Sequence, residues 1–383
     1  MFAILRKVII IVILSAVITG TPPSALAASE DWELLNEIYN LTEENYVNQV
    51  DSDVLEEAAI RGLINSLGDP YSQYISPDEV SEFCSSVDEE YVGIGVVLQQ
   101  IGDQLIIRDV IPNSPAARKG VRAGSIVVSV DGITIKGLAL DKIGKLFNGE
   151  AGEYIRLTVT LPGIGTRENY SIKQEKIRPP VVNSFLMDGE VGYLYLKSFP
   201  YWAPDEIATA LAELQAQDAR GLILDLRGNL GGYLEAATEI ASLFLLKDKP
   251  VVKIVDRNNK VEIVRSKGPG QDLPMIVLVD GQTASAAEIL AGALQANNAA
   301  LVLGTRTYGK GALQTVYPLS NGGVLKLTTA YYITPDNQSI EGEGLKPDVR
   351  VTAKEKPVEK ALEILKEQFC DTFANESLVC QEI

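Results

Sequence analysis

The stretch GLILDLRGNLGG, residues 221–232, decides how the second half of this chain folds. It begins with an apolar run of the length and composition of a buried β-strand. The paired glycines at its end permit a sharp turn, and the apolar spacing that follows predicts a helix over about 234–246. A strand leading through a glycine-rich turn into a helix is typical of a sheet covered by helices, so this part of the chain is predicted to be α/β.

The same alternation continues on both sides of this stretch. Asn321-Gly322-Gly323 is a turn signal that predicts a hairpin between two late strands. The further predicted strands are 191–196, 275–279 and 300–303, and the further predicted helices are 207–214 and about 286–296.

The first half of the chain divides into two regions of different character. Residues 28–80 are predicted to be helical because apolar residues recur at helical spacing, with Gly68-Asp69-Pro70 as a stop and Pro77 as a new helix start. From about 91 to 173, short β segments punctuated by glycine predict a compact β-rich module.

The N-terminus is predicted to be a secretory signal rather than part of the fold. Arg6 and Lys7 precede an apolar run over 8–17, and Ala25-Leu26-Ala27 supplies a small-residue cleavage site. The apolar run is short for a membrane span. The sequence therefore predicts an exported protein with residues 1–27 removed, and an uncleaved membrane anchor stays open as the alternative.

Composition excludes several kinds of catalytic site. The chain has 383 residues, 46% of them hydrophobic, and contains no histidine. A Ser-His-Asp triad, a Cys-His dyad and a His-ligated zinc site are therefore impossible, and any acid–base group must be Asp, Glu, Lys, Tyr or Cys. With 34 basic and 51 acidic residues the formal net charge is −17, which argues against nucleic acid as a partner.

The three cysteines leave one pairing open. Cys370 and Cys380 lie close together near the C-terminus, and a disulfide between them would clip the tail in an oxidising compartment. If Cys370 and Cys380 form this disulfide, Cys84 remains a free thiol. The sequence offers no CxxC metal or redox motif.

Two motifs offer a nucleophile and a base. Ser285, in Thr283-Ala284-Ser285-Ala286-Ala287-Glu288, lies between a predicted strand and a predicted helix, where backbone N–H groups favour developing negative charge. The plainer interpretation is a Ser-x-x-Glu capping box. Lys310 lies between two glycines in a loop, where it is either an ordinary surface lysine or a base that needs a desolvated pocket.

Two glycine motifs offer backbone N–H groups. Gly231-Gly232 at a strand-to-helix turn is either an oxyanion hole or a plain tight turn, and neither phosphate-binding glycine pattern is present. Gly93-Ile94-Gly95-Val96 opens a predicted strand, where it is either a bulge or a site for a peptide C-terminal carboxylate.

Taken together, these motifs resemble the C-terminal processing peptidases, or tail-specific proteases, which are Ser/Lys serine proteases with a PDZ domain. The resemblance covers nearly the whole chain after residue 27 and rests on ordered motifs with matching spacing. These include Gly68 to Pro77, Gly93 to Leu98, Ile111 to Ala117, Asp225 to Gly232, Thr283 to Glu288, Tyr308 to Gly311 and Gly342 to Val349.

The resemblance implies an α/β (α+β multidomain) fold with a crotonase/ClpP-like α/β catalytic core. The implied domains are a signal peptide at 1–27, an N-terminal helical segment at 28–86, a PDZ domain at 87–173, the protease core at 174–366 and a tail at 367–383.

The resemblance also implies the roles of the site residues. Ser285 is the expected nucleophile, Lys310 the general base, and Gln314 the glutamine that orients the lysine. The expected oxyanion donors are the N–H of Ala286 and of either Gly231 or Gly232, and the expected peptide-binding residues are Gly93, Ile94, Gly95 and Val96.

The function implied is cleavage of protein substrates that have an apolar free C-terminus. Neither a cofactor nor a metal is expected, contact with membranes is expected only through substrates, and both a monomer and a dimer stay open. The expected location is the periplasm, the thylakoid lumen or the medium. Maturation of the photosystem II reaction-centre protein and general periplasmic tail-specific proteolysis are the two roles considered.

Three alternatives come from other classes. A non-catalytic PDZ scaffold needs no pairing of Ser285 with Lys310. A carboxylate-driven glycosidase needs a pair of catalytic carboxylates, and no spacing of Asp and Glu residues in this sequence indicates such a pair. A crotonase-type acyl-CoA enzyme shares the core fold but lacks the PDZ insertion.

Overall fold

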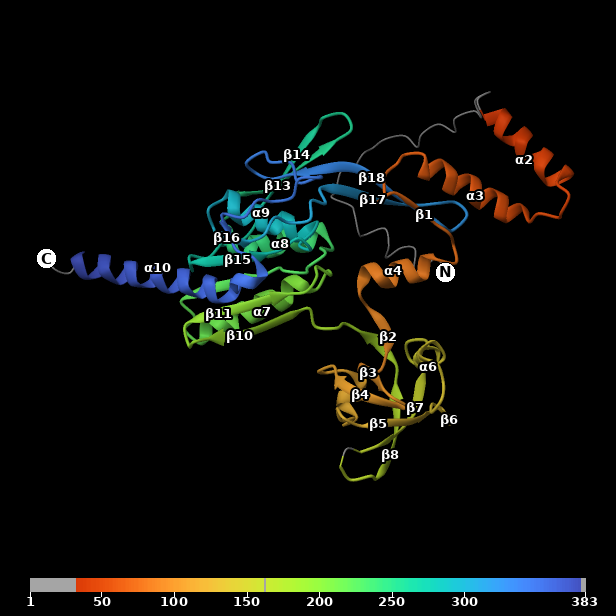
Figure 1. Ribbon diagram of the computed structural model, residues 1–383, viewed down its shortest axis with the longest axis horizontal. Coiled ribbons are helices and arrows are strands. Elements are labelled where there is room, and N and C mark those ends of the chain that lie inside the picture. The colour runs from red at the N-terminus through yellow and green to blue at the C-terminus, as the bar shows by residue number, and fades with distance from the viewer. Residues whose placement is uncertain (1–31, 162, 380–383) are drawn as a thin grey trace. The chain divides into compact units, whose positions relative to one another are not determined.

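The structure, a computed structural model, describes residues 32–161 and 163–379 (Figure 1). It comprises two compact units, of which the second is 85–183 and the first combines the chain before and after that segment. The predicted signal peptide at 1–27 lies outside the described residues. So does the predicted Cys370–Cys380 pairing, because neither Cys380 nor the Cys370 side chain is described.

A six-stranded sheet forms the centre of the first unit, in the order β10-β11-β12-β15-β16-β19. The strands from β11 to β19 are parallel, as the alternation of strands and helices predicted. The bounds are β10 Val182–Met187, β11 Val191–Leu196, β12 Gly221–Asp225, β15 Met275–Val279, β16 Leu301–Gly304 and β19 Val349–Arg350.

Both faces of this sheet are covered, because every residue of β12 is buried. Ile223 shares a cluster with Leu365 and Phe369 of α10, whereas Leu222, which points the opposite way, lies with Leu214 of α7 beside Gly192. The helices of this unit's core are α7 Ala203–Ala216, α8 Leu234–Phe244, α9 Ala286–Ala296 and α10 Pro357–Val379, with the 3₁₀ turn η2 Ala353–Glu355.

A second, antiparallel sheet in the same unit brings in the N-terminal part of the chain. Its order is β1-β18-β13-β14, and β17 also pairs with β18 (Figure 1). The hairpin predicted at Asn321 is confirmed as the β17–β18 connection. The bounds are β1 Gln73–Ile75, β13 Pro250–Asp256, β14 Val261–Arg265, β17 Ala312–Pro318 and β18 Val324–Ile333.

The N-terminal segment is helical, but with two differences from the prediction. The helices are α2 Glu33–Asn45, α3 Ser52–Asn65 and α4 Val80–Asp88. The helix expected to start at Pro77 begins at Val80, because the Glu79 carboxylate accepts the N–H and hydroxyl of Ser76 and folds 76–79 into a turn. Strand β1 was not predicted, since three residues show no periodicity and the partner strand is some 250 residues away.

The second unit is the predicted β-rich module. Its main sheet has the order β3-β4-β5-β7-β8, so β3 lies at an edge, and β6 pairs with β5 while β2 pairs with β9. The predicted closing hairpin is confirmed as β7–β8. The bounds are β2 Tyr91–Gly93, β3 Val96–Ile101, β4 Gln104–Val110, α5 Pro115–Arg118, β5 Ile126–Val130, β6 Ile133–Thr134, α6 Leu140–Phe147, β7 Tyr154–Thr160, β8 Arg167–Lys173 and β9 Glu175–Ile177.

Candidate active site

Ser285 lies at the start of α9 with its backbone in an unusual conformation. Its φ of +56° is in the left-handed region, which costs a residue with a side chain about 1–3 kcal/mol. Ser285 itself is partly exposed, although the flanking Ala284 and Ala286 are buried. The strained turn therefore presents one accessible hydroxyl at the N-terminus of a helix, as the sequence predicted.

Lys310 lies two residues before β17 and is partly buried. Its ammonium nitrogen lies 5.0 Å from the ring centroid of Tyr71. Burial lowers the pKa of Lys310 below its ordinary value, and the like charge of Lys326 lowers it further, while Glu341 and Glu288 act in the opposite direction. This environment favours the neutral amine, which is the form that can accept a proton.

The carboxylate of Glu288 connects the serine turn to the lysine loop. Its Oε2 accepts the backbone N–H of Ser285 and of Lys310, both at 2.9 Å. Its Oε1 accepts the Gly309 N–H at 2.8 Å and the Thr307 hydroxyl at 2.5 Å. Glu288 is fully buried, so these four hydrogen bonds form away from water.

The sequence predicted only a helix-capping role for Glu288. The Ser285 N–H bond is that cap, but the same carboxylate also holds the loop that carries Lys310. Burial raises the pKa of Glu288, and its four hydrogen bonds act in the opposite direction. All four partners are donors, which matches an ionised carboxylate that can only accept.

Asn229 organises the glycine-rich turn. Its buried side chain accepts the Gly231 N–H at 2.8 Å and donates to the Leu196 carbonyl at 2.8 Å. Its own carbonyl accepts the Ala284 N–H at 2.9 Å, which ties the turn to the residue before Ser285. The N–H of Gly231 is therefore already engaged.

The neighbouring N–H groups are available. Those of Gly232 and Ala286 have no hydrogen-bond partner among the residues that the structure describes. The turn touches the serine directly, because a Cβ added to Gly231 would lie 2.8 Å from the Ser285 Cβ and 3.0 Å from the Ala286 nitrogen. Ser285 and two available N–H groups thus belong to one packed arrangement.

Gln314 lies on β17, four residues beyond Lys310. Its amide nitrogen donates to the Ala312 carbonyl at 3.0 Å and to the Thr328 hydroxyl at 3.3 Å. These bonds fix the amide within the β17–β18 hairpin. That it orients Lys310 stays a prediction.

Comparison with known proteins identifies the family. The pattern described as "Peptidase family S41" matches residues 190–351, "Activating protease CtpB N-terminal domain" matches 16–79, and "PDZ domain" matches 106–160. The carboxy-terminal processing protease CtpA of Bacillus subtilis (strain 168) is 31% identical over 355 residues, covering 91% of this chain and 76% of that protein. The chain belongs to peptidase family S41.

Further members of the family agree. A probable CtpA-like serine protease of Staphylococcus aureus (strain N315) is 33% identical over 321 residues, which are 83% of this chain and 64% of that protein. The solved structure of a photosystem II D1 C-terminal processing protease matches with a TM-score of 0.50 and 27% identity, covering 85% of this chain and 94% of that one. The predicted family, the α/β fold with a PDZ domain, and the class of C-terminal processing serine proteases are confirmed.

The PDZ domain of this S41 member has an open sheet edge where peptide binding was predicted. Gly95, with φ +79°, is packed so closely that an added Cβ would lie 2.2 Å from the Ser114 Cβ. Its carbonyl accepts the Ile111 N–H at 2.9 Å and the Ser114 hydroxyl at 3.3 Å. These contacts hold the turn rigidly at the beginning of the edge strand β3.

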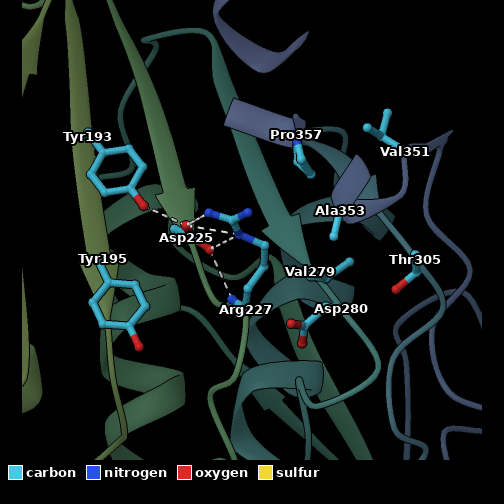
Figure 2. A pocket seen from close by; sticks show the side chains of 10 residues that line it. All are labelled: Tyr193, Tyr195, Asp225, Arg227, Val279, Asp280, Thr305, Val351, Ala353 and Pro357. Carbon is cyan, nitrogen blue, oxygen red and sulfur yellow. Dashed lines mark hydrogen bonds and ion pairs between the residues drawn. The ribbon is translucent and has the colours of Figure 1, made fainter. Parts of the chain in front are cut away.

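A cavity of about 330 Å³ lies beyond the C-terminal ends of β11, β12 and β15 (Figure 2). In it Asp225 accepts the Arg227 N–H at 3.0 Å, pairs with the Arg227 guanidinium and accepts the Tyr193 hydroxyl at 2.5 Å. Burial and the bond to Asp225 raise the pKa of Tyr193. This ion pair fixes the beginning of the turn that continues to Asn229 and the paired glycines.

Two general observations concern the described part of the chain. No helix there has the length and apolar character that crossing a membrane requires. No group of three or more Cys, Asp or Glu side chains there is placed to hold a metal ion.

Proposed function

We propose that this S41 protease captures a protein by its free C-terminus through the PDZ domain and cleaves near that end by a Ser/Lys acyl-enzyme mechanism. The observation that carries the proposal is the Glu288 network, in which one buried carboxylate holds both the Ser285 and the Lys310 backbone. A base located beside the nucleophile is what a chain without histidine requires.

In the proposed reaction, the neutral Lys310 amine accepts the hydroxyl proton as the Ser285 oxygen attacks the peptide carbonyl carbon. The resulting oxyanion receives hydrogen bonds from the N–H groups of Ala286 and Gly232, the two that are available. Lys310 returns the proton to the leaving amine as the peptide bond breaks. The same lysine then takes a proton from water, which releases the acyl group and restores Ser285.

The proposed substrate class is a precursor with an apolar C-terminus. A peptide added along edge strand β3 would have its carboxylate at the turn formed by Gly93 to Val96. Val96 and Leu98 of β3, with Leu146 and Phe147 of α6, are partly buried apolar side chains around this domain's core, which suits apolar residues. The predicted secretory signal at 1–27 supports an exported location. The solved relative named for photosystem II D1 C-terminal processing supports a precursor that is processed at its C-terminus as the substrate.

The test compares Ser285→Ala, Lys310→Ala and the native chain on a protein with an apolar free C-terminus. Released C-terminal peptides are measured by mass spectrometry, and circular dichroism checks folding. Each variant is expected to lose about 10⁴–10⁶-fold in kcat, on the order of the loss seen when one member of a catalytic unit is removed. A folded Lys310→Ala variant that cleaves at the native rate contradicts the Ser/Lys mechanism.

A further inference from the structure

The lysine loop is covered by a piece of the N-terminal segment, residues 69–75, which we call the N-terminal strap. Its β1 strand adds to β18, with Gln73 opposite Lys326. The Thr328 N–H donates to the Ser72 hydroxyl at 3.0 Å, and Asn321 donates to the Tyr74 hydroxyl at 2.8 Å. Backbone pairing and side-chain bonds therefore attach the strap to the same hairpin that begins after Lys310.

The strap has a defined local conformation before β1. The carboxylate of Asp69 accepts the Tyr71 N–H at 3.0 Å and the Ser72 hydroxyl at 2.5 Å. Ser72 is in turn buried and held by Thr328. Because the residues on either side are held, the direction of the Tyr71 Cα–Cβ bond is fixed by the backbone.

Tyr71 points its ring at Lys310, with 5.0 Å between the ring centroid and the ammonium nitrogen. The charged groups that act on Lys310 come from three other places: Lys326 on β18, Glu288 on α9, and Glu341, which accepts the Gly311 N–H at 2.7 Å. Tyr71 is the contact with Lys310 that the N-terminal segment contributes.

We propose that Tyr71 is a positioning residue for the catalytic base, because its ring holds the Lys310 side chain in place and excludes water from the amine. The inference rests on the proposed role of Lys310 in catalysis. It also means that the base is complete only when the N-terminal strap is paired with β18.

Two effects of the ring oppose each other. A cation–π contact favours the charged amine, and at a partly exposed site it raises the amine pKa by less than about one pH unit. Exclusion of water favours the neutral amine, and burial can move a lysine pKa by several units. The burial of Lys310 is the larger influence on its pKa, so removal of the ring is expected to raise that pKa.

The activity test uses Tyr71→Ala, Tyr71→Leu and Tyr71→Phe in the full chain. Tyr71→Ala is expected to move the acidic limb of the kcat/KM profile upward by about one pH unit, with roughly tenfold lower kcat/KM on that limb. Tyr71→Leu keeps an apolar cover and Tyr71→Phe keeps the ring, so both are expected within about threefold of the native chain. Tyr317→Ala removes a more exposed tyrosine from β17 as the matched control and should not move the limb.

A second measurement does not depend on activity. Pulsed acetylation with acetic anhydride across pH, followed by peptide mapping, reports the pKa of the Lys310 amine directly. A higher midpoint in Tyr71→Ala than in Tyr71→Phe supports the inference even if Lys310→Ala retains activity and the proposed mechanism fails. The inference is overturned if folded Tyr71→Ala keeps the native acetylation midpoint and pH profile. It is also overturned if Tyr71→Phe loses as much kcat/KM as Tyr71→Ala.

Discussion

Replacing Glu288 with glutamine tests whether one buried carboxylate holds the serine and the lysine together. Glutamine has nearly the same shape, but it exchanges one acceptor oxygen for an NH₂ donor. If NH₂ replaces Oε2, the N–H groups of Ser285 and Lys310 both face a donor. If NH₂ replaces Oε1, the Gly309 N–H faces a donor. The Thr307 oxygen, which already accepts the Leu345 N–H, can also accept from the NH₂, but its own O–H then loses its acceptor.

The second arrangement is the less costly one, and it sets the expected magnitude. It leaves the Gly309 N–H and the buried Thr307 O–H without their acceptor, and a buried donor without a partner costs about 1–3 kcal/mol. It also replaces two charge-assisted hydrogen bonds, those of Ser285 and Lys310, with neutral ones that are roughly half as strong. The free energy of unfolding of Glu288→Gln is therefore expected to fall by about 2–4 kcal/mol.

The assay combines urea unfolding with steady-state cleavage of a peptide that has an apolar free C-terminus. Because the common acceptor of the serine turn and the lysine loop becomes a neutral oxygen, and the Gly309 N–H loses its acceptor, kcat is expected to fall by about 10–100-fold, with KM changing less. Glu235→Gln on α8 is a suitable control, since the charged groups that act on Lys310 in the described part of the chain do not include that carboxylate. Native stability and native kcat in Glu288→Gln would refute the reasoning.

Two further substitutions change the surroundings of Lys310 and Ser285, and one change of substrate tests the PDZ turn. Lys326→Met removes the like charge that lowers the pKa of Lys310, so that pKa should rise. The acidic limb of the kcat/KM profile should therefore move to higher pH, and a limb that stays in place or moves to lower pH contradicts the prediction. Gly231→Ala should lower the free energy of unfolding, measured in urea, by roughly 2–4 kcal/mol and abolish cleavage, because the new Cβ would collide with Ser285 and the backbone there has a positive φ. A stable, active variant would mean that the turn is not packed against Ser285. Amidation of a substrate's C-terminus should raise KM at least tenfold if the turn at Gly95 binds the carboxylate, and equal rates for acid and amide exclude that role.

Much of the fold could be predicted because its signals are local. The apolar run at 221–226 predicts a buried strand, and the glycines after it predict a sharp turn. Asn321-Gly322-Gly323 predicts the β17–β18 hairpin. Ordered motifs in the sequence also pointed to the family that the comparisons confirm. Local signals failed at β1, where three residues form a strand only because β18 is there to pair with them.

The sequence by itself determined the kinds of group available to this protein: a serine before a helix, a lysine between glycines, and no histidine to assist them. Only the tertiary structure decided that Glu288 serves both loops, that Asn229 engages one glycine N–H, and that Tyr71 covers Lys310. The reason is physical, because a hydrogen bond or a desolvated amine depends on which distant segments meet. No periodicity along the chain carries that information.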